Sequence, residues 1–463
     1  MTSHPEKPDI DEELAAIGSN NGGEVQDAVF GAAEEGGPNY RSVTWVGASI
    51  LMMKSEMGIG ILSIPEAFGT LGLIPGILVL LAISGVTTWS SYVVGVFKLK
   101  HPQAYGFADT AAIIFGPVGR EVASVAFCLL WIFVAASGLL GVSIGLNAVS
   151  THGTCTAVLV AVSAIMGFGV SSVRTLSKMS WLAWVGMISI VAAVFSLTVA
   201  VGVQDRPAEA PQEGPYVSTW KLFGNPTFAD AMAAIASIIF AFCGVPAYFS
   251  VVSEMADPRQ YPYSLALCRG VATGVYVTIG IVVYYYCGDY VASPALGSAG
   301  VLMKKVCYGL ALPGLIMSMT LYLHITAKYI FIRLLRGSKH LTANSFTHWA
   351  TWLACTAITT IIAYCIASGI PAFGGLVSLV GALFGTLLCF QPEGIMWIYD
   401  NWHSHDRGST RWTAMVCWSI FVIVLGTFLM VAGTYGSVVG LINTFAETDG
   451  SAAWSCADNS NSV

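Results

Sequence analysis

The sequence is poor in charge, since charged residues make up 10% of its 463 residues and hydrophobic residues make up 55%. Its mean hydropathy is +0.71. A soluble globule of this length needs more polar side chains than this to cover its surface. The composition therefore excludes a soluble protein and predicts an integral membrane protein.

Several motifs are also missing. No long basic run suggests nucleic-acid binding, and no Asn-x-Ser/Thr acceptor site (x other than Pro) reports which loops face outward. The cluster of His403, His405 and Asp406 has no further ligand at suitable spacing, so we expect no metal and no cofactor.

A membrane-embedded enzyme that uses His324 is an alternative class. No nucleophile or donor-binding motif accompanies this histidine, so we expect no catalytic residue.

Eleven cysteines are present, nearly all in apolar segments. A free cysteine packs there as a small hydrophobic side chain. Cys287 and Cys307 flank one expected outer loop and could form a disulfide, although the sequence does not give the distance between them.

Long apolar runs recur along the chain. A transmembrane helix needs ~20 predominantly apolar residues. About eleven segments have roughly this length, at residues 43–68, 73–97, 121–148, 155–173, 181–203, 228–252, 265–288, 306–332, 348–368, 372–391 and 412–436. We therefore expect an all-α protein with about eleven transmembrane helices.

The basic residues orient these helices. If the N-terminus is cytosolic, fourteen basic residues fall on the inner side, namely Lys7, Arg41, Lys98, Lys100, Arg120, Arg174, Lys178, Arg259, Arg269, Arg333, Arg336, Lys339, Arg407 and Arg411. Four fall on the outer side, namely Arg206, Lys221, Lys304 and Lys305. The positive-inside rule therefore predicts a cytosolic N-terminus and an extracytosolic C-terminus.

Two of the expected spans are interrupted. The first contains Gly58, Gly60 and Pro65, and the sixth contains Gly244 and Pro246. Glycine and proline let the backbone leave helical geometry, and non-helical backbone at membrane depth survives only where it lines a cavity or is buried in protein. Interrupted spans at matching positions of two halves indicate a solute site at the membrane midplane, so we expect a cavity beside these breaks.

The matching breaks divide the chain into parts. Each opens a unit of five spans, and because five is odd, the second unit is inverted relative to the first. We expect a disordered acidic cytosolic tail at residues 1–40, a first repeat at 41–203 and an outer loop at 204–227. A second repeat at 228–391, an inner loop with the eleventh helix at 392–436 and an extracytosolic tail at 437–463 follow.

The segment from Met57 to Pro65 resembles the first-helix signature of the amino acid/auxin permease family. The segment from Ser253 to Pro262 resembles the Glu-Met-x-Asp-Pro-x-x-Phe/Tyr-Pro motif that follows its sixth helix. The segment from Tyr322 to Arg333 is similar to that of fungal neutral amino-acid permeases. The resemblance covers about residues 41–436 and implies the LeuT-type fold, in which two inverted five-helix repeats are followed by one extra helix.

The breaks offer main-chain groups to a zwitterion. Free N–H groups of Gly58, Ile59 and Gly60 lie where the helix dipole is positive and suit a carboxylate. Exposed carbonyls around Met57 and in the segment Phe240–Cys243, next to Gly244, suit an ammonium. Aromatic wall candidates are Trp131, Phe133, Phe240, Phe242 and Tyr248. No acid clearly pairs with a cationic side chain, so we expect a neutral amino acid, with large or aromatic ones included.

The coupling ion is assigned from Lys54. Sodium-coupled members of the resembled family carry asparagine at the matching position, and a desolvated lysine that takes the cation's place loses its proton more readily. Lys54 could instead be a structural partner of Glu56 or Glu254.

His324 and Lys328 lie four residues apart on one helical face, with Thr326 nearby, and histidine suits proton handling. Glu254 could also pair with Arg259 or Arg269.

The sequence therefore predicts a secondary transporter that carries neutral amino acids with protons across the plasma membrane, with the vacuolar membrane as the alternative. A sodium-coupled transporter and an amino-acid-binding sensor with little flux are the competing hypotheses. The expected partners are a small amino acid, protons and membrane lipid, and the sequence does not give the oligomeric state.

Overall fold

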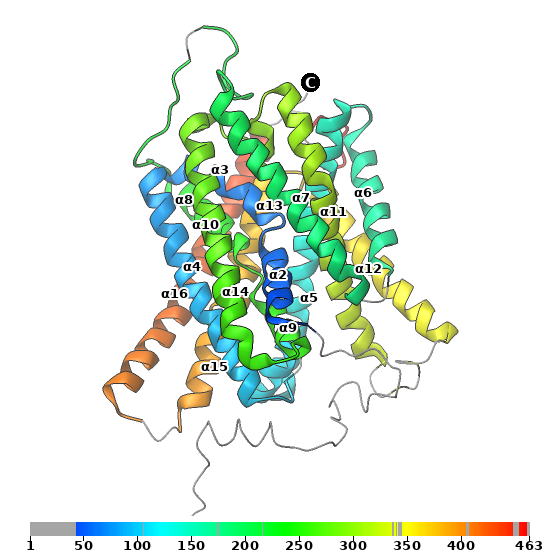
Figure 1. The fold of residues 1–463 in the computed structure, drawn as a ribbon, viewed down its shortest axis with the longest axis vertical. Coiled ribbons are helices and arrows are strands. Elements are labelled where there is room, and N and C mark those ends of the chain that lie inside the picture. Colours follow the sequence, from blue (N-terminus) through cyan, green and yellow to red (C-terminus); the bar gives the residue numbers. More distant parts are fainter. Residues whose placement is uncertain are drawn as a thin grey trace, which may run out of the picture. The chain divides into compact units, whose positions relative to one another are not determined.

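The computed structural model describes residues 43–104, 106–173, 176–214, 216–335, 338, 340, 345–403, 407–447 and 453–460, without the side chains of 176–183 and 447. This part of the chain is helical and contains no strand, which confirms the expected all-α class (Figure 1). The cytosolic tail expected at residues 1–40 lies outside the described residues, as do residues 404–406 of the histidine cluster.

The α-helices are α2 (Trp45–Glu56), α3 (Ile64–Leu71), α4 (Leu73–Lys100), α5 (Phe107–Ser150), α6 (Thr156–Ser171), α7 (Leu176–Val203), α8 (Phe228–Ala241), α9 (Tyr248–Glu254), α10 (Tyr261–Cys287), α11 (Val301–Leu335), α12 (Phe346–Gly369), α13 (Phe373–Val380), α14 (Thr386–Cys389), α15 (Gln391–Asn401) and α16 (Thr410–Glu447). Short 3₁₀ helices cover Gly60–Ser63, Val245–Ala247, Pro258–Gln260, Gly288–Tyr290 and Ala295–Ser298. A π-helical turn covers Gly381–Gly385.

Nine helical segments of the described residues are long and apolar enough to cross a membrane. The pair α2 and α3 makes a tenth, bent by 45° (Figure 1). Helix α6 is apolar but has 16 residues, and it lies where the fourth span is expected. Each of the expected spans therefore corresponds to helix, although α16 runs to Glu447, beyond residue 436 where the eleventh helix was expected to end.

Both predicted interruptions are present. Helix α2 ends at Glu56, and regular helix resumes only at Ile64. Helix α8 ends at Ala241, and α9 starts at Tyr248 after a 3₁₀ turn. The second interruption bends the chain less than the first, because residues 228–254 still form one membrane-length segment.

The tenth span contains an interruption that the sequence reading missed. Helix α13 passes through the π-helical turn at Gly381–Gly385 and into α14. Phe390 then has φ −126° and ψ −55°, and α15 begins with Pro392 in its first turn. Proline is favoured in the first turn of a helix because its missing N–H would have no partner there.

A disulfide joins the start of α6 to the C-terminal segment, between Cys155 and Cys456. Cys287 and Cys307 are free and buried in the apolar core, so the disulfide suggested between them is wrong. The C-terminal segment also accepts hydrogen bonds from Thr156 Oγ1 to Ala457 O, at 2.6 Å, and from Asn147 Nδ2 to Asn459 Oδ1, at 2.8 Å. The segment is therefore fixed to the ends of α5 and α6.

We predict that Cys456→Ser lowers the free energy of unfolding by about 2–5 kcal/mol, because the unfolded chain loses a long-range cross-link. Chemical denaturation of the purified protein in detergent measures this, with Cys365→Ser as the control because Cys365 is free and exposed. Alkylation of Cys155 in native, unreduced wild-type protein would contradict the assignment.

Candidate functional site

The first break leaves main-chain groups without partners. The N–H of Met57 still donates to Met53 O at 2.7 Å, and the N–H of Leu62 donates to Ile59 O at 3.1 Å. Between these two bonds, the N–H groups of Gly58 and Ile59 donate no hydrogen bond to any described residue. Unpaired N–H groups that precede a helix are suited to bind an anion.

The second break repeats this arrangement. The N–H of Cys243 donates to Phe240 O at 3.2 Å, and Gly244 O accepts from the Ala247 N–H at 3.0 Å. The N–H of Gly244 has no hydrogen-bond acceptor among the described residues. One expected ammonium ligand in this segment is already used, because Ala241 O accepts from Tyr276 Oη at 3.0 Å.

The glycines bring the two breaks into contact. A Cβ on Gly60 would lie 2.6 Å from Ala241 Cα, and a Cβ on Gly244 would lie 2.8 Å from Ser55 Oγ. A Cβ on Gly58 would lie 2.6 Å from Ser318 Oγ of α11. Side chains of that size would push the broken helices apart, so the glycines permit the close approach as well as the change in backbone geometry.

Two cavities of the described structure do not include the first break. Neither of them is lined by Met57, Gly58, Ile59 or Gly60. The larger one, of about 430 Å³, lies between α3, α8, α13 and α16 and is lined by residues that include Glu66, Asp230 and Ser437. The glycine contacts leave little space between the two breaks themselves, so the expectation of a cavity directly beside Gly58 and Gly60 stays a prediction.

Aromatic side chains surround the first break. Trp131 stacks on Tyr322, with ring centroids 5.2 Å apart, and Tyr322 Oη donates to Ser55 O at 3.2 Å. Trp131 Nε1 is buried and has no hydrogen-bond partner among the described residues. Phe242 packs edge-on against Tyr276 at 5.2 Å. The structure thus brings two expected wall residues, Trp131 and Phe242, to the breaks, together with Tyr322 and Tyr276, which the sequence reading missed.

The other aromatic candidates have different surroundings. Phe133 packs against Phe384 of the π-helical turn, at 5.3 Å. Phe240 is buried in the apolar core at the end of α8. Tyr248 is engaged through its hydroxyl with Glu56. Tyr248, a candidate wall residue, therefore also belongs to the hydrogen-bond network of Glu56.

Lys54 joins the first broken span to α11. Its Nζ donates to Ser318 Oγ at 2.8 Å and to Gly314 O at 3.1 Å, and the residue is 1% exposed. The suggested pairing of Lys54 with Glu56 or Glu254 is wrong. Residues two apart on a helix do not face each other, so Lys54 and Glu56 point to different neighbours.

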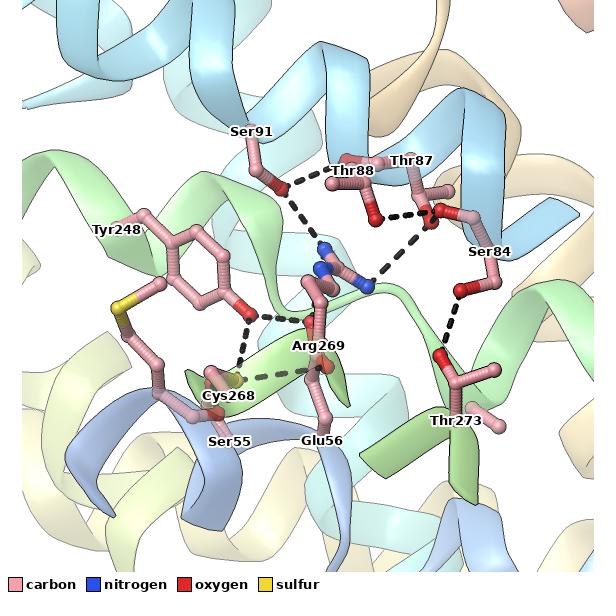
Figure 2. Close-up of polar contacts among 12 residues, drawn as sticks. Ser55, Glu56, Ser84, Thr87, Thr88, Ser91, Tyr248, Cys268, Arg269 and Thr273 are labelled. Carbon is pink, nitrogen blue, oxygen red and sulfur yellow. Dashed lines mark hydrogen bonds and ion pairs between the residues drawn. The ribbon is translucent and has the colours of Figure 1, made fainter. Parts of the chain in front are cut away.

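Glu56 forms a fully buried ion pair with Arg269 of α10, with Oε1 and Nη2 3.0 Å apart (Figure 2). The Tyr248 hydroxyl donates to the same carboxylate oxygen. Arg269 also donates to Ser91 Oγ at 2.8 Å and to Thr87 Oγ1 at 3.4 Å, both on α4. One carboxylate therefore connects the end of α2, the start of α9, α10 and, through the guanidinium, α4.

Arg269 was expected in an inner loop, but the structure places it within α10, where it is 3% exposed. Its pairing with Glu254 was a further possibility, and the structure shows Glu56 as its partner instead. A signal was available, since Arg269 falls inside the apolar segment 265–288. A charged side chain in a transmembrane segment generally requires a partner.

The remaining candidates for ion coupling contact residues other than Lys54. His324 Nδ1 lies 3.2 Å from Ser171 O, and its ring packs edge-on against Trp352 of α12. Thr326 Oγ1 donates to Tyr322 O of its own helix at 3.0 Å, and Lys328 is half-buried. Glu254 ends α9, and its carbonyl accepts from the Val43 N–H at 3.2 Å. The contacts of His324 and Thr326 do not join them to Lys54.

Known protein sequences match most of this chain. The sequence model of the family described as transmembrane amino acid transporter protein matches residues 41–439. A transmembrane transporter of Gibberella moniliformis is 36% identical over 432 residues, which cover 92% of this chain and 90% of that protein. The N amino acid transport system protein of Neurospora crassa is 28% identical over 427 residues, with coverages of 92% and 90%.

Solved structures show the same fold. Mhp1, a nucleobase-cation-symport-1 family transporter in a closed conformation, gives a TM-score of 0.53 at 13% identity, covering 91% of this chain and 96% of that one. A Na⁺-coupled sialic acid symporter in an outward-open state gives 0.54 at 12% identity, covering 87% and 91%. Mhp1 is a LeuT-fold transporter, so the expected fold class is confirmed.

We predict that Arg269→Met lowers the free energy of unfolding by about 3–5 kcal/mol, because it leaves the buried Glu56 carboxylate without its cation. The double variant Glu56→Gln/Arg269→Met should recover most of this loss. Denaturation in detergent measures both. The control is Glu121→Gln at the surface pair of Glu121 and Arg333, where the change should stay within about 1 kcal/mol. Equal losses in the single and double variants would contradict the prediction.

Proposed function

The chain belongs to the family of transmembrane amino acid transporter proteins, and we propose that it carries neutral amino acids together with protons by alternating access. The observation that carries the proposal is the unpaired main chain at the first break. Gly58 and Ile59 are buried, and their N–H groups have no hydrogen-bond acceptor in the part of the chain that the structure describes. Desolvated donors of this kind are costly unless a ligand satisfies them.

The substrate's two charged ends suit the two breaks. Its carboxylate would accept from Gly58, Ile59 and Gly60, and its ammonium would donate to carbonyls at Met57 and in the segment 240–243. Its side chain would then lie towards Trp131 and the rings on α8 and α11. The close contact between Gly60 and Ala241 would have to open for the substrate to enter.

The charge around the breaks supports a neutral substrate. Glu56 is the carboxylate next to the first break, and Arg269 and Tyr248 already satisfy it. A cationic side chain would have to compete with the Arg269 guanidinium for this acid. An anionic side chain would meet the same buried carboxylate, so both charged classes are disfavoured relative to neutral amino acids.

Lys54 supports proton coupling over sodium coupling. Its ammonium contacts a hydroxyl and a carbonyl oxygen of α11, which are hard oxygen ligands of the type that a sodium ion would need. We propose that protonated Lys54 ties the first broken span to α11 and that loss of the proton towards the cytosol releases it. His324 remains a second candidate for proton transfer, because its buried Nε2 has no partner among the described residues.

The disulfide supports the proposed topology. The loop before α6 and the C-terminal segment are both expected outside the cytosol, and Cys155 and Cys456 join these two segments. Disulfides persist in oxidising compartments and are rare in the cytosol. We therefore propose inverted repeats at residues 41–203 and 228–391, with a cytosolic N-terminus, in the plasma membrane.

We predict that proteoliposomes containing the purified chain accumulate labelled neutral amino acids when the outside is more acidic than the lumen. At a gradient of about one pH unit, each coupled proton supports about tenfold accumulation, since tenfold corresponds to about 1.4 kcal/mol. Labelled lysine and glutamate are the substrate controls. Accumulation driven by a sodium gradient alone would favour the sodium-coupled transporter, and binding without flux would favour the sensor.

We also predict that Lys54→Met abolishes acceleration of uptake by external acid, while exchange of labelled for unlabelled substrate at equal pH continues. Lys305→Met, at the outer part of α11, serves as the matched control. Uptake by Lys54→Met with the wild-type pH profile would contradict the assignment of Lys54.

A further inference from the structure

Glu393 stands in the first turn of α15, directly after the interruption of the tenth span. It is fully buried, at 0% exposure. Neither Oε1 nor Oε2 has a hydrogen-bond partner among the described residues, and no described cation pairs with it. In this it differs from Glu56, whose burial is compensated by Arg269 and Tyr248.

An ionised carboxylate in such surroundings is strongly disfavoured. Removal of a charge from water costs several kcal/mol unless a partner compensates it. Glu393 avoids this cost if it binds a proton, because the neutral acid loses much less solvation. The structure therefore describes Glu393 in an environment that suits its protonated form.

The elements packed against α15 supply no compensating charge. They are α4, α5, α14 and α16. Their titratable or charged side chains that the structure describes are Tyr92, Lys98, Lys100, Asp109, Arg120, Glu121, Cys128, Cys389, Arg411, Cys417 and Tyr435, and His101 directly follows α4. The ion pairs that these groups form within the described residues involve Asp400, Asp109 and Arg333, and none of these pairs includes Glu393.

A polar cluster lies on the same face of α15 as Glu393. Asp400 lies seven residues further along this face, about 10 Å away at 1.5 Å per residue. It binds His101 Nε2 at 2.8 Å. Glu393 therefore shares a helix face with a polar cluster that contains a histidine.

The backbone before Glu393 departs from a regular α-helix at two places. One is the π-helical turn at Gly381–Gly385, and the other is Phe390, whose φ and ψ are not helical although its N–H still donates to Thr386 O at 3.2 Å. π-Turns of this kind are rare and are frequently found at functional sites. A movement of α15 against α4 would bring water to a carboxyl that is sealed in the present packing.

We propose that Glu393 is a proton-binding site whose proton is exchanged during the transport cycle. In the sealed conformation the carboxylate holds one proton as the neutral acid. When α15 moves and water reaches the site, the O–H bond breaks, the proton leaves to water on the inner side and the solvated carboxylate remains. The proposal rests on the proposed function and adds a second proton site to it, besides Lys54.

The direct test is infrared difference spectroscopy of the full-length protein in lipid, recorded with and without a neutral amino acid. We expect a carboxylic-acid carbonyl band from wild type that changes on substrate addition and is absent from Glu393→Gln. Glu393→Asp keeps the acid and should restore a shifted band. If Glu393→Gln does not fold, ¹³C labelling of wild-type glutamate carboxyls identifies whether the band belongs to a glutamic acid. A spectrum without a substrate-sensitive glutamic-acid band overturns the proposal.

The functional test compares wild type, Glu393→Gln and the surface control Glu121→Gln in proteoliposomes. Because the amide cannot exchange a proton, Glu393→Gln should lower the limiting accumulation ratio about tenfold at a gradient of about one pH unit. Substrate exchange at equal pH should continue. Wild-type accumulation that is unchanged in Glu393→Gln overturns this inference alone. A wild type that does not respond to the pH gradient overturns the proposed function and this inference with it.

Discussion

The buried ion pair between Glu56 and Arg269 is the interaction on which the geometry of the centre depends. It connects the end of α2 to α10, and the hydroxyl of Tyr248 brings the start of α9 to the same carboxylate. In a low-dielectric interior neither charge is tolerable alone, so the pair forces the two broken spans to stay together. These noncovalent contacts thereby hold the main-chain groups of the two breaks next to each other.

The glycines set how closely these elements approach. Gly60 meets the backbone of α8, and Gly244 meets Ser55 and Glu56. Such contacts leave little space between the two breaks, and a cavity of about 430 Å³ lies nearby, beside Glu66 and Asp230. Entry of a substrate requires that the contacts open, so the same residues that place the binding groups also act as the barrier.

The sequence predicted the features that are local. Gly58, Gly60 and Pro65 mark the first break, Gly244 and Pro246 mark the second, and apolar length marks the spans. Contacts between distant segments were not accessible, because no pattern within α2 or α10 specifies that Glu56 meets Arg269. The same holds for Cys155 and Cys456, which are separated by 301 residues. The break in the tenth span was missed although Pro392 follows it, because the apolar run continues through Phe390.

The central claim is that the main chain of the first break binds the carboxylate of a neutral amino acid. The most direct measurement is an electron cryo-microscopy structure of the protein in lipid with such an amino acid bound. The account predicts carboxylate oxygens about 2.7–3.2 Å from the nitrogens of Gly58 and Ile59. A ligand bound in the cavity beside Glu66 and Asp230, with both N–H groups still unpaired, would contradict it.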